Sequence, residues 1–176
     1  MKIIISILAL FSAAVSTSSA RLGETEAECE ARYGKCIAVL SIEPSALADS
    51  SLAFLKEGIK VTISFWKGRA VEVLYGSESL RALSRDGVLT LLAANAAGSE
   101  WVRVETNSRP QVQAPARNEA LSFSKWTRKD GLATACFDPN NGLSISDSAF
   151  QDALKAHHAA IAAAASEAEK ARLKGF

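Results

Sequence analysis

Two runs of alternating residues on either side of a glycine turn limit the fold more than any other feature of the sequence. Residues 59–66 alternate between apolar and polar side chains, and residues 69–75 do the same after Lys67-Gly68. Because successive side chains of a strand point to opposite faces of a sheet, each run predicts a strand with one buried face. The glycine-containing turn predicts an antiparallel hairpin, and the apolar run at residues 52–55 predicts a third strand beside it.

A second set of strand and turn signals follows later in the chain. Its predicted strands cover residues 101–104, 121–128, 132–137 and 143–145. The turn residues of Lys129-Asp130-Gly131 and Asp138-Pro139-Asn140-Asn141-Gly142 predict the reversals between them. We therefore expect a second antiparallel meander.

A short helix is predicted before each meander. Thr25 and Glu28 have the spacing of a capping box, in which each side chain satisfies a backbone N–H of the first turn, and Gly34 predicts the helix end after Tyr33. The second helix is predicted from Ser84 to Asn95, with apolar residues at helical spacing between them. The expected fold class is α+β, with short helices packed on an antiparallel meander sheet or sheets and the helix–meander arrangement present twice.

The end of the chain predicts a long helix. It begins at Asp147 and runs to about Lys174, and ten of the 19 residues from Ala153 to Ala171 are alanine, the residue with the highest helix propensity. Alanine buries little apolar area, so we expect the first half of this helix to pack on the sheet. The second half is expected to project or to meet a partner.

The amino terminus has the pattern of a secretory signal peptide. Lys2 precedes an apolar stretch, and small residues at Ser18 and Ala20 predict cleavage before Arg21. The apolar stretch is shorter than the roughly 20 residues of a membrane-spanning helix. The predicted organisation is a signal peptide at 1–20, an α+β domain at 21–146 and a C-terminal helix at 147–176, the halves 21–104 and 121–146 being joined by a loop at 105–120.

The composition restricts the partners that an exported chain of this kind would have. Without residues 1–20, the chain carries 19 basic and 19 acidic residues. Nucleic-acid binders normally show a basic excess, and anionic membrane surfaces attract basic segments. We therefore expect a periplasmic or secreted protein that binds no nucleic acid and is not inserted in a membrane after signal cleavage.

The region from Gly23 to the hairpin resembles a known group of small exported bacterial proteins. Gly23, Thr25, Tyr33, Gly34 and Gly68 match the opening of the SmpA/OmlA (BamE-like) and beta-lactamase-inhibitor-like group, in which a short helix is followed by an antiparallel meander. The chain lacks the proline and the lipidation cysteine of that group. The resemblance implies a binding or scaffolding fold and carries over no catalytic residue or cofactor.

Catalytic and metal-binding patterns are weak in this sequence. Cys29, Cys36 and Cys136 leave three disulfide pairings open, with one thiol left over. The adjacent His157 and His158 point about 100° apart on a helix and are poorly placed to share a metal ion. We expect no metal, no cofactor and no enzymatic activity. The alternative hypothesis is an exported hydrolase or thiol enzyme that uses Cys136 and His157.

The tryptophans provide the candidate binding residues. Trp66 is expected on the polar face of its strand, while Trp126 shares a face with Arg128. These two tryptophans and Arg128 are the candidate residues of an aromatic patch for a peptide, a glycan or another envelope or secreted protein, since aromatic residues and arginine are enriched at binding hot spots. The other interpretation, left open for Trp66, Trp101 and Trp126, is that they are core residues. The predicted function is a non-enzymatic protein-binding or scaffolding role in the cell envelope.

Overall fold

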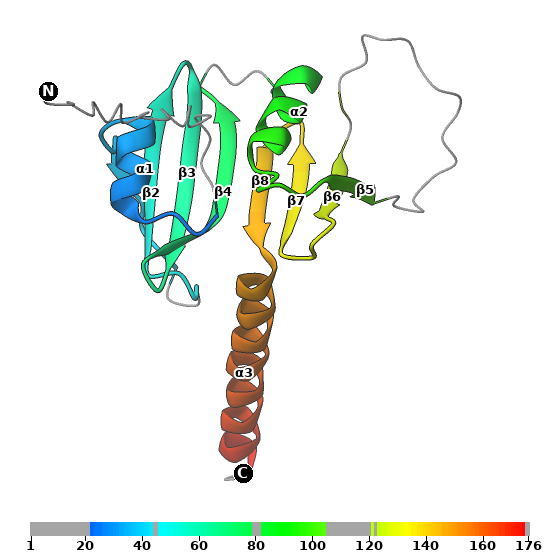
Figure 1. Ribbon diagram of the computed structural model, residues 1–176. Helices are drawn as coiled ribbons and strands as arrows, with labels where there is room; N and C mark the ends of the chain where they lie inside the picture. Colours follow the sequence, from blue (N-terminus) through cyan, green and yellow to red (C-terminus); the bar gives the residue numbers. More distant parts are fainter. Residues whose placement is uncertain (1–21, 44–45, 79–81, 105–120, 122, 175–176) are drawn as a thin grey trace, which may run out of the picture.

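The protein is an antiparallel sheet with three helices (Figure 1), and the computed structural model describes residues 22–43, 46–78, 82–104, 121 and 123–174. The helices are α1 (Glu26–Tyr33), α2 (Arg85–Ala94) and α3 (Ser148–Leu173). The strands are β1 (Ala38–Val39), β2 (Ser50–Lys56), β3 (Ile59–Trp66), β4 (Arg69–Ser77), β5 (Trp101–Val104), β6 (Ser124–Arg128), β7 (Ala133–Asp138) and β8 (Gly142–Asp147). The α+β class is confirmed.

The two predicted meanders form one continuous sheet. Within the described residues the strand order is β1-β2-β3-β4-β8-β7-β6-β5, so the last strands of the two halves meet at the centre. β4 and β8 pair there in antiparallel register, with Val73 opposite Ile145 and Tyr75 opposite Leu143. Each half is a helix followed by four strands, which confirms the repeated helix–meander arrangement.

One face of the sheet carries α1 and α2, and we call it the covered face. Figure 1 shows α1 in front of β2 and β3, and α2 in front of β8 and β7. The Tyr33 ring of α1 lies 5.6 Å from that of Phe54 on β2. The fully buried side chains of the strands join Cys29 of α1 and Val88 of α2 in one hydrophobic core. The alternation of buried residues along β3 and β4 follows directly from this arrangement.

The helix ends agree with the capping residues of the sequence. Thr25 accepts a hydrogen bond from the Glu28 N–H and the Glu28 carboxylate accepts one from the Thr25 N–H, which confirms the capping box. The backbone hydrogen bond from Thr25 is the main reason why the pKa of Glu28 lies below its usual value. Ser84 and Asp147 are the N-caps of α2 and α3, and their side chains accept hydrogen bonds from the Gly87 and Phe150 N–H groups.

Several boundaries differ from the prediction. β1 was not predicted, because two residues are too few for a periodic pattern. β6 begins at Ser124 instead of residue 121, and β7 runs one residue beyond Phe137. The predicted signal peptide at 1–20 and loop at 105–120 lie outside the described residues.

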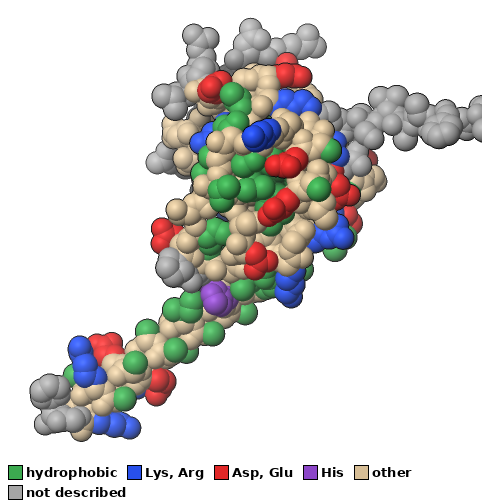
Figure 2. Space-filling model, turned by 90° about the vertical axis from the view of Figure 1, so that its left-hand side faces the viewer, with side chains coloured by type: hydrophobic (Ala, Val, Ile, Leu, Met, Phe, Trp, Pro, Cys, Tyr) green, Lys and Arg blue, Asp and Glu red, His purple; other side chains and the backbone are tan. Residues whose placement is uncertain are grey.

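The third helix leaves the body of the protein, as Figures 1 and 2 show. Its first turn is anchored by Phe150, which is buried and has its ring 5.7 Å from that of Trp66. Almost every residue from Lys155 onward is exposed. The division into a packed first part and a projecting remainder is therefore confirmed, although the packed part is shorter than half of the helix. None of the described helices is both long and apolar enough to cross a membrane.

Candidate binding site

Trp126 and Arg128 lie on the covered face and are buried. Their side chains are 6% and 8% exposed. Arg128 donates hydrogen bonds to both carboxylate oxygens of Asp130, each at 2.9 Å, and to the backbone carbonyl of Asn95 at 3.3 Å. Asn95 is the C-cap of α2, so Arg128 places its positive charge at the negative end of that helix. The shared face of the two residues was predicted from the sequence, and of the two interpretations left open for Trp126 the structure supports the core residue.

Two further contacts fix the same end of α2. The indole N–H of Trp101 donates to the Leu92 carbonyl at 2.7 Å, and the Asn95 amide donates to the Tyr75 hydroxyl at 3.1 Å. These groups come from β5 and β4, on both sides of the central strand β8. The last carbonyls of a helix lack partners within the helix, which explains why the buried Arg128 and the half-buried Trp101 donate to them here.

Trp66 lies on the opposite face, half-buried, as its polar neighbours predicted. Its ring contacts Phe150 of α3, and the Lys67 ammonium lies 4.0 Å from the ring centroid. Trp66, Trp126 and Arg128 therefore do not form one surface patch, and that part of the prediction is corrected. Period-two alternation assigns residues to two faces, but it does not say which face the helices will cover.

The face opposite α1 and α2, which we call the open face, is lined by hydroxyl groups. One row crosses the sheet through paired positions and consists of Thr127, Thr134, Ser146, Glu72 and Ser64. The Glu72 carboxylate accepts hydrogen bonds from Ser144 and Ser146, both at 3.1 Å. This arrangement joins β4 to β8 and places a carboxylate in the middle of the row.

A hollow of about 440 Å³ lies on the open face, and we call it the basin. Its floor includes Glu72, Ser144 and Ser146, and Val104, Phe123 and Lys125 lie on the side of β5 and β6. Phe123 is 51% exposed, and Lys125 lies 5.5 Å from the centroid of its ring. An exposed aromatic ring at the side of a hollow lined by both apolar and polar groups is a feature of protein-binding surfaces. No sequence pattern singles out Phe123, Val104 or Lys125.

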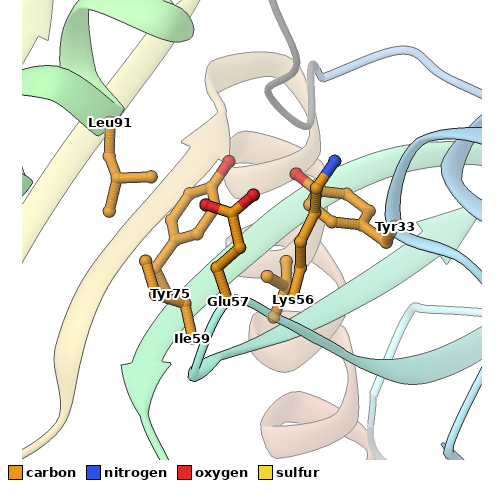
Figure 3. Close-up of a pocket in the computed structure, with 7 residues that line it drawn as sticks. Tyr33, Lys56, Glu57, Ile59, Tyr75 and Leu91 are labelled. Carbon is orange, nitrogen blue, oxygen red and sulfur yellow. The ribbon is translucent and has the colours of Figure 1, made fainter.

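A smaller hollow of about 270 Å³ lies on the covered face beside α1 and α2 (Figure 3). Ile59, Val61 and Leu91 provide its apolar lining, and Lys56, Glu57 and two tyrosines add polar groups. Lys56 donates to the Arg32 carbonyl at the end of α1, at 2.8 Å. Part of this lining therefore already serves to hold α1 on the sheet.

The cysteines and histidines do not assemble a catalytic group in the described residues. Cys29, Cys36 and Cys136 are free thiols in the structure. Burial raises the pKa of Cys29 to about 12, and burial also raises the pKa of Cys136. No hydrogen bond within the described part of the chain joins Cys136 to His157, and no cluster there could hold a metal ion. Because its pKa is raised, the Cys136 thiol is mostly protonated at neutral pH.

We expect Cys136 to be alkylated slowly by iodoacetamide at pH 7. Its pKa lies above the ordinary thiol value of 9.0, so the reactive thiolate is scarce at neutral pH and the rate should rise as the pH passes that value. Peptide mass spectrometry after timed labelling measures this rate, with glutathione as the reference thiol. Labelling of Cys136 at pH 7 faster than that of glutathione would revive the thiol-enzyme alternative.

The fold and the site define an α+β protein with one helix-covered sheet face and one open, hydroxyl-lined face. No family model matches the chain, and neither curated proteins nor solved structures give a match. The resemblance of its amino-terminal region to the SmpA/OmlA and beta-lactamase-inhibitor-like group therefore stays a prediction.

Proposed function

We propose that this chain is an exported, non-enzymatic protein that binds another protein of the cell envelope. The observation that carries the proposal is the exposed apolar rim of the basin. Phe123 and Val104 lie there, beside the polar floor of the open face. Apolar side chains surrounded by polar groups are typical of surfaces that bind other proteins.

Two other features support binding to another protein. Ile37 and Val39 are exposed at the β1 end of the sheet, on the side of the molecule where Figure 2 shows a group of hydrophobic side chains. The projecting part of α3 adds a long exposed helix. The signal-peptide pattern of residues 1–20 supports export.

The proposal predicts that substitution of Phe123 by serine removes a captured partner. The full-length chain, carrying a C-terminal tag, is expressed in its native host and captured from the extracytoplasmic fraction. We expect the intact mass of a protein that begins at Arg21, and a co-purifying protein that is lost with Phe123→Ser because the aromatic contact of the rim is lost. Quantitative mass spectrometry of wild-type and variant captures measures the difference.

The matched control is Leu132→Ser, which removes a large apolar side chain that is also exposed, 61%, but lies outside the basin lining. This variant should retain the partner. A capture that is the same for wild type and Phe123→Ser, or a chain that stays in the cytoplasm with residues 1–20 attached, contradicts the proposal.

A further inference from the structure

β5 forms an edge of the sheet whose backbone groups are oriented toward a further strand. The strand order of the described residues ends at β5. The Glu100 carbonyl accepts from the Lys129 N–H at 2.8 Å, in the same register as the β5–β6 pairs. Because hydrogen-bonded and non-bonded pairs alternate in an antiparallel ladder, Trp101 and Arg103 must direct their backbone N–H and C=O groups away from β6.

Among the described residues, this edge has few of the features that usually prevent strand addition. Protected edges are very short or carry proline, charged side chains or a bulge. β5 has one charged residue, Arg103, but no proline or lysine, and its four residues pair with β6 without a register shift. The opposite edge is different, since β1 has two residues.

The side chains of β5 determine the chemistry of a strand that would fit beside it. Val102 and Val104 are 46% and 43% exposed, and their pairing with Thr127 and Lys125 places them on the open face. Arg103 pairs with Trp126, so it lies on the other face. Residues opposite one another in neighbouring strands share a face and interact.

The charge of this edge is positive. Arg103 is exposed and donates a hydrogen bond to the Ser124 hydroxyl at 2.8 Å. Lys125 of β6 is also exposed, but it pairs with Val104 and lies on the open face, opposite to Arg103. None of the salt bridges among the described residues involves either side chain, whereas the neighbouring Arg128 and Lys129 are paired with Asp130 and Glu100. A partner with a carboxylate at this position would complement the edge.

We propose that β5 binds an extended segment of another protein in which an acidic residue lies between two β-branched or aromatic residues. The segment adds a strand to the sheet, with its acidic side chain beside Arg103 and its apolar side chains beside Val102 and Val104. The inference rests on the proposed protein-binding function and deepens it, because it names the kind of segment that is recognised. Backbone hydrogen bonds provide the affinity, and the alternate side chains provide the specificity.

The test uses fluorescein-labelled nine-residue peptides, the full mature protein and fluorescence anisotropy. One peptide has Val-Glu-Val at its centre, and its matched control has Val-Lys-Val. We expect the acidic peptide to bind the wild type about tenfold more tightly than the basic peptide, and we expect Arg103→Glu to reverse the order. A reversed order would show that the central residue of the peptide lies beside residue 103, and would exclude a general electrostatic attraction between the peptide and the protein. Lys60→Glu, at an exposed lysine of β3, serves as the charge control and should leave the order unchanged.

A second variant tests the backbone contribution separately. Arg103→Pro removes the outward N–H while leaving the N–H groups that β5 directs to β6, and proline is tolerated at such edge positions. It should weaken binding of both peptides at least as much as Arg103→Glu weakens that of the acidic one. Circular dichroism establishes that each variant is folded. The affinities of the two peptides for the wild-type protein can also be compared directly, without any variant.

Three results would overturn the proposal. The first is binding of neither peptide, and the second is equal binding of the acidic peptide to wild type and Arg103→Glu. The third is a dimer in sedimentation analysis that Arg103→Pro dissociates, since a second copy would then occupy β5. If a partner is still captured and still lost with Phe123→Ser, the proposed function stands although this inference has failed. If that capture fails as well, both are wrong.

Discussion

Replacement of Gly142 by alanine is expected to lower the free energy of unfolding by about 4 kcal/mol, from backbone strain and overpacking together. Gly142 has a φ of +96°, a conformation that L side chains rarely adopt. A Cβ placed on it would lie 2.0 Å from the Tyr75 carbonyl oxygen and 3.2 Å from the Cα of Gly76. These atoms belong to the backbone of β4, so relief of the clash requires the central pair β4–β8 to separate locally.

The matched control for this prediction is Gly131→Ala in the preceding turn. Gly131 also has a positive φ, +74°, but nothing lies within 4 Å of the position of its Cβ. This variant should therefore lose about 1 kcal/mol, from backbone strain alone. Urea unfolding of the mature protein measures both losses. Equal losses for the two variants would mean that the close approach of β8 to β4 does not limit stability.

The comparison of these glycines shows what the sequence could and could not predict. Both were predicted as turn residues, because glycine near aspartate and asparagine is typical of reversals. Gly142 also faces Gly76 across the central strand pair β4–β8. This contact depends on the strand order, which cannot be predicted from local periodicity. The same limit applies to β5. Its strand was predicted at residues 101–104, but its position at the edge depends on which strand pairs with which.

Elements with a strong local pattern were predicted well for a physical reason. The β3–β4 hairpin has alternation on both strands and a glycine in the turn, and α1 has a capping box that is satisfied within four residues. The candidate site was predicted less well. The alternation along β6 left open whether Trp126 and its neighbour Arg128 belong to a surface patch or to the core, and in the structure both are buried and the end of α2 covers them. A buried arginine that serves a helix end has no local signature in the sequence.

The two faces of the sheet therefore have different roles. On the covered face, polar groups such as Arg128 and the Asn95 amide donate hydrogen bonds to the last carbonyls of α2, so their role is structural. On the open face, the hydroxyl row and Glu72 join the two halves, while Phe123 and the edge β5 remain exposed. Substitutions on the covered face should affect stability, and those at the rim of the open face should affect binding alone.

The clearest test on the covered face is Arg128→Met, which keeps an unbranched apolar stem in place of the arginine methylenes but removes the charge and the hydrogen-bond donors. It is expected to lower the free energy of unfolding by about 1–3 kcal/mol because the Asn95 carbonyl loses a buried donor. Asp130 also loses its ion-pair partner. Lys129→Met is the matched control, because its ion pair with Glu100 is largely exposed, and it should leave stability unchanged within error.

The pH dependence of the same variant separates the ion pair from the contact with α2. The hydrogen bond from Arg128 lowers the pKa of Asp130 below its ordinary value of 3.8. A carboxyl group whose folded pKa is lowered contributes stability above its ordinary pKa and loses that contribution as the pH falls through the folded value. The free energies of unfolding of wild type and Arg128→Met, measured with urea, should therefore differ by a constant amount from pH 7 to about 5. This difference should become smaller below pH 3.8. The remainder at low pH reports the bond to Asn95, and a difference that does not change with pH would show that Asp130 contributes nothing to it.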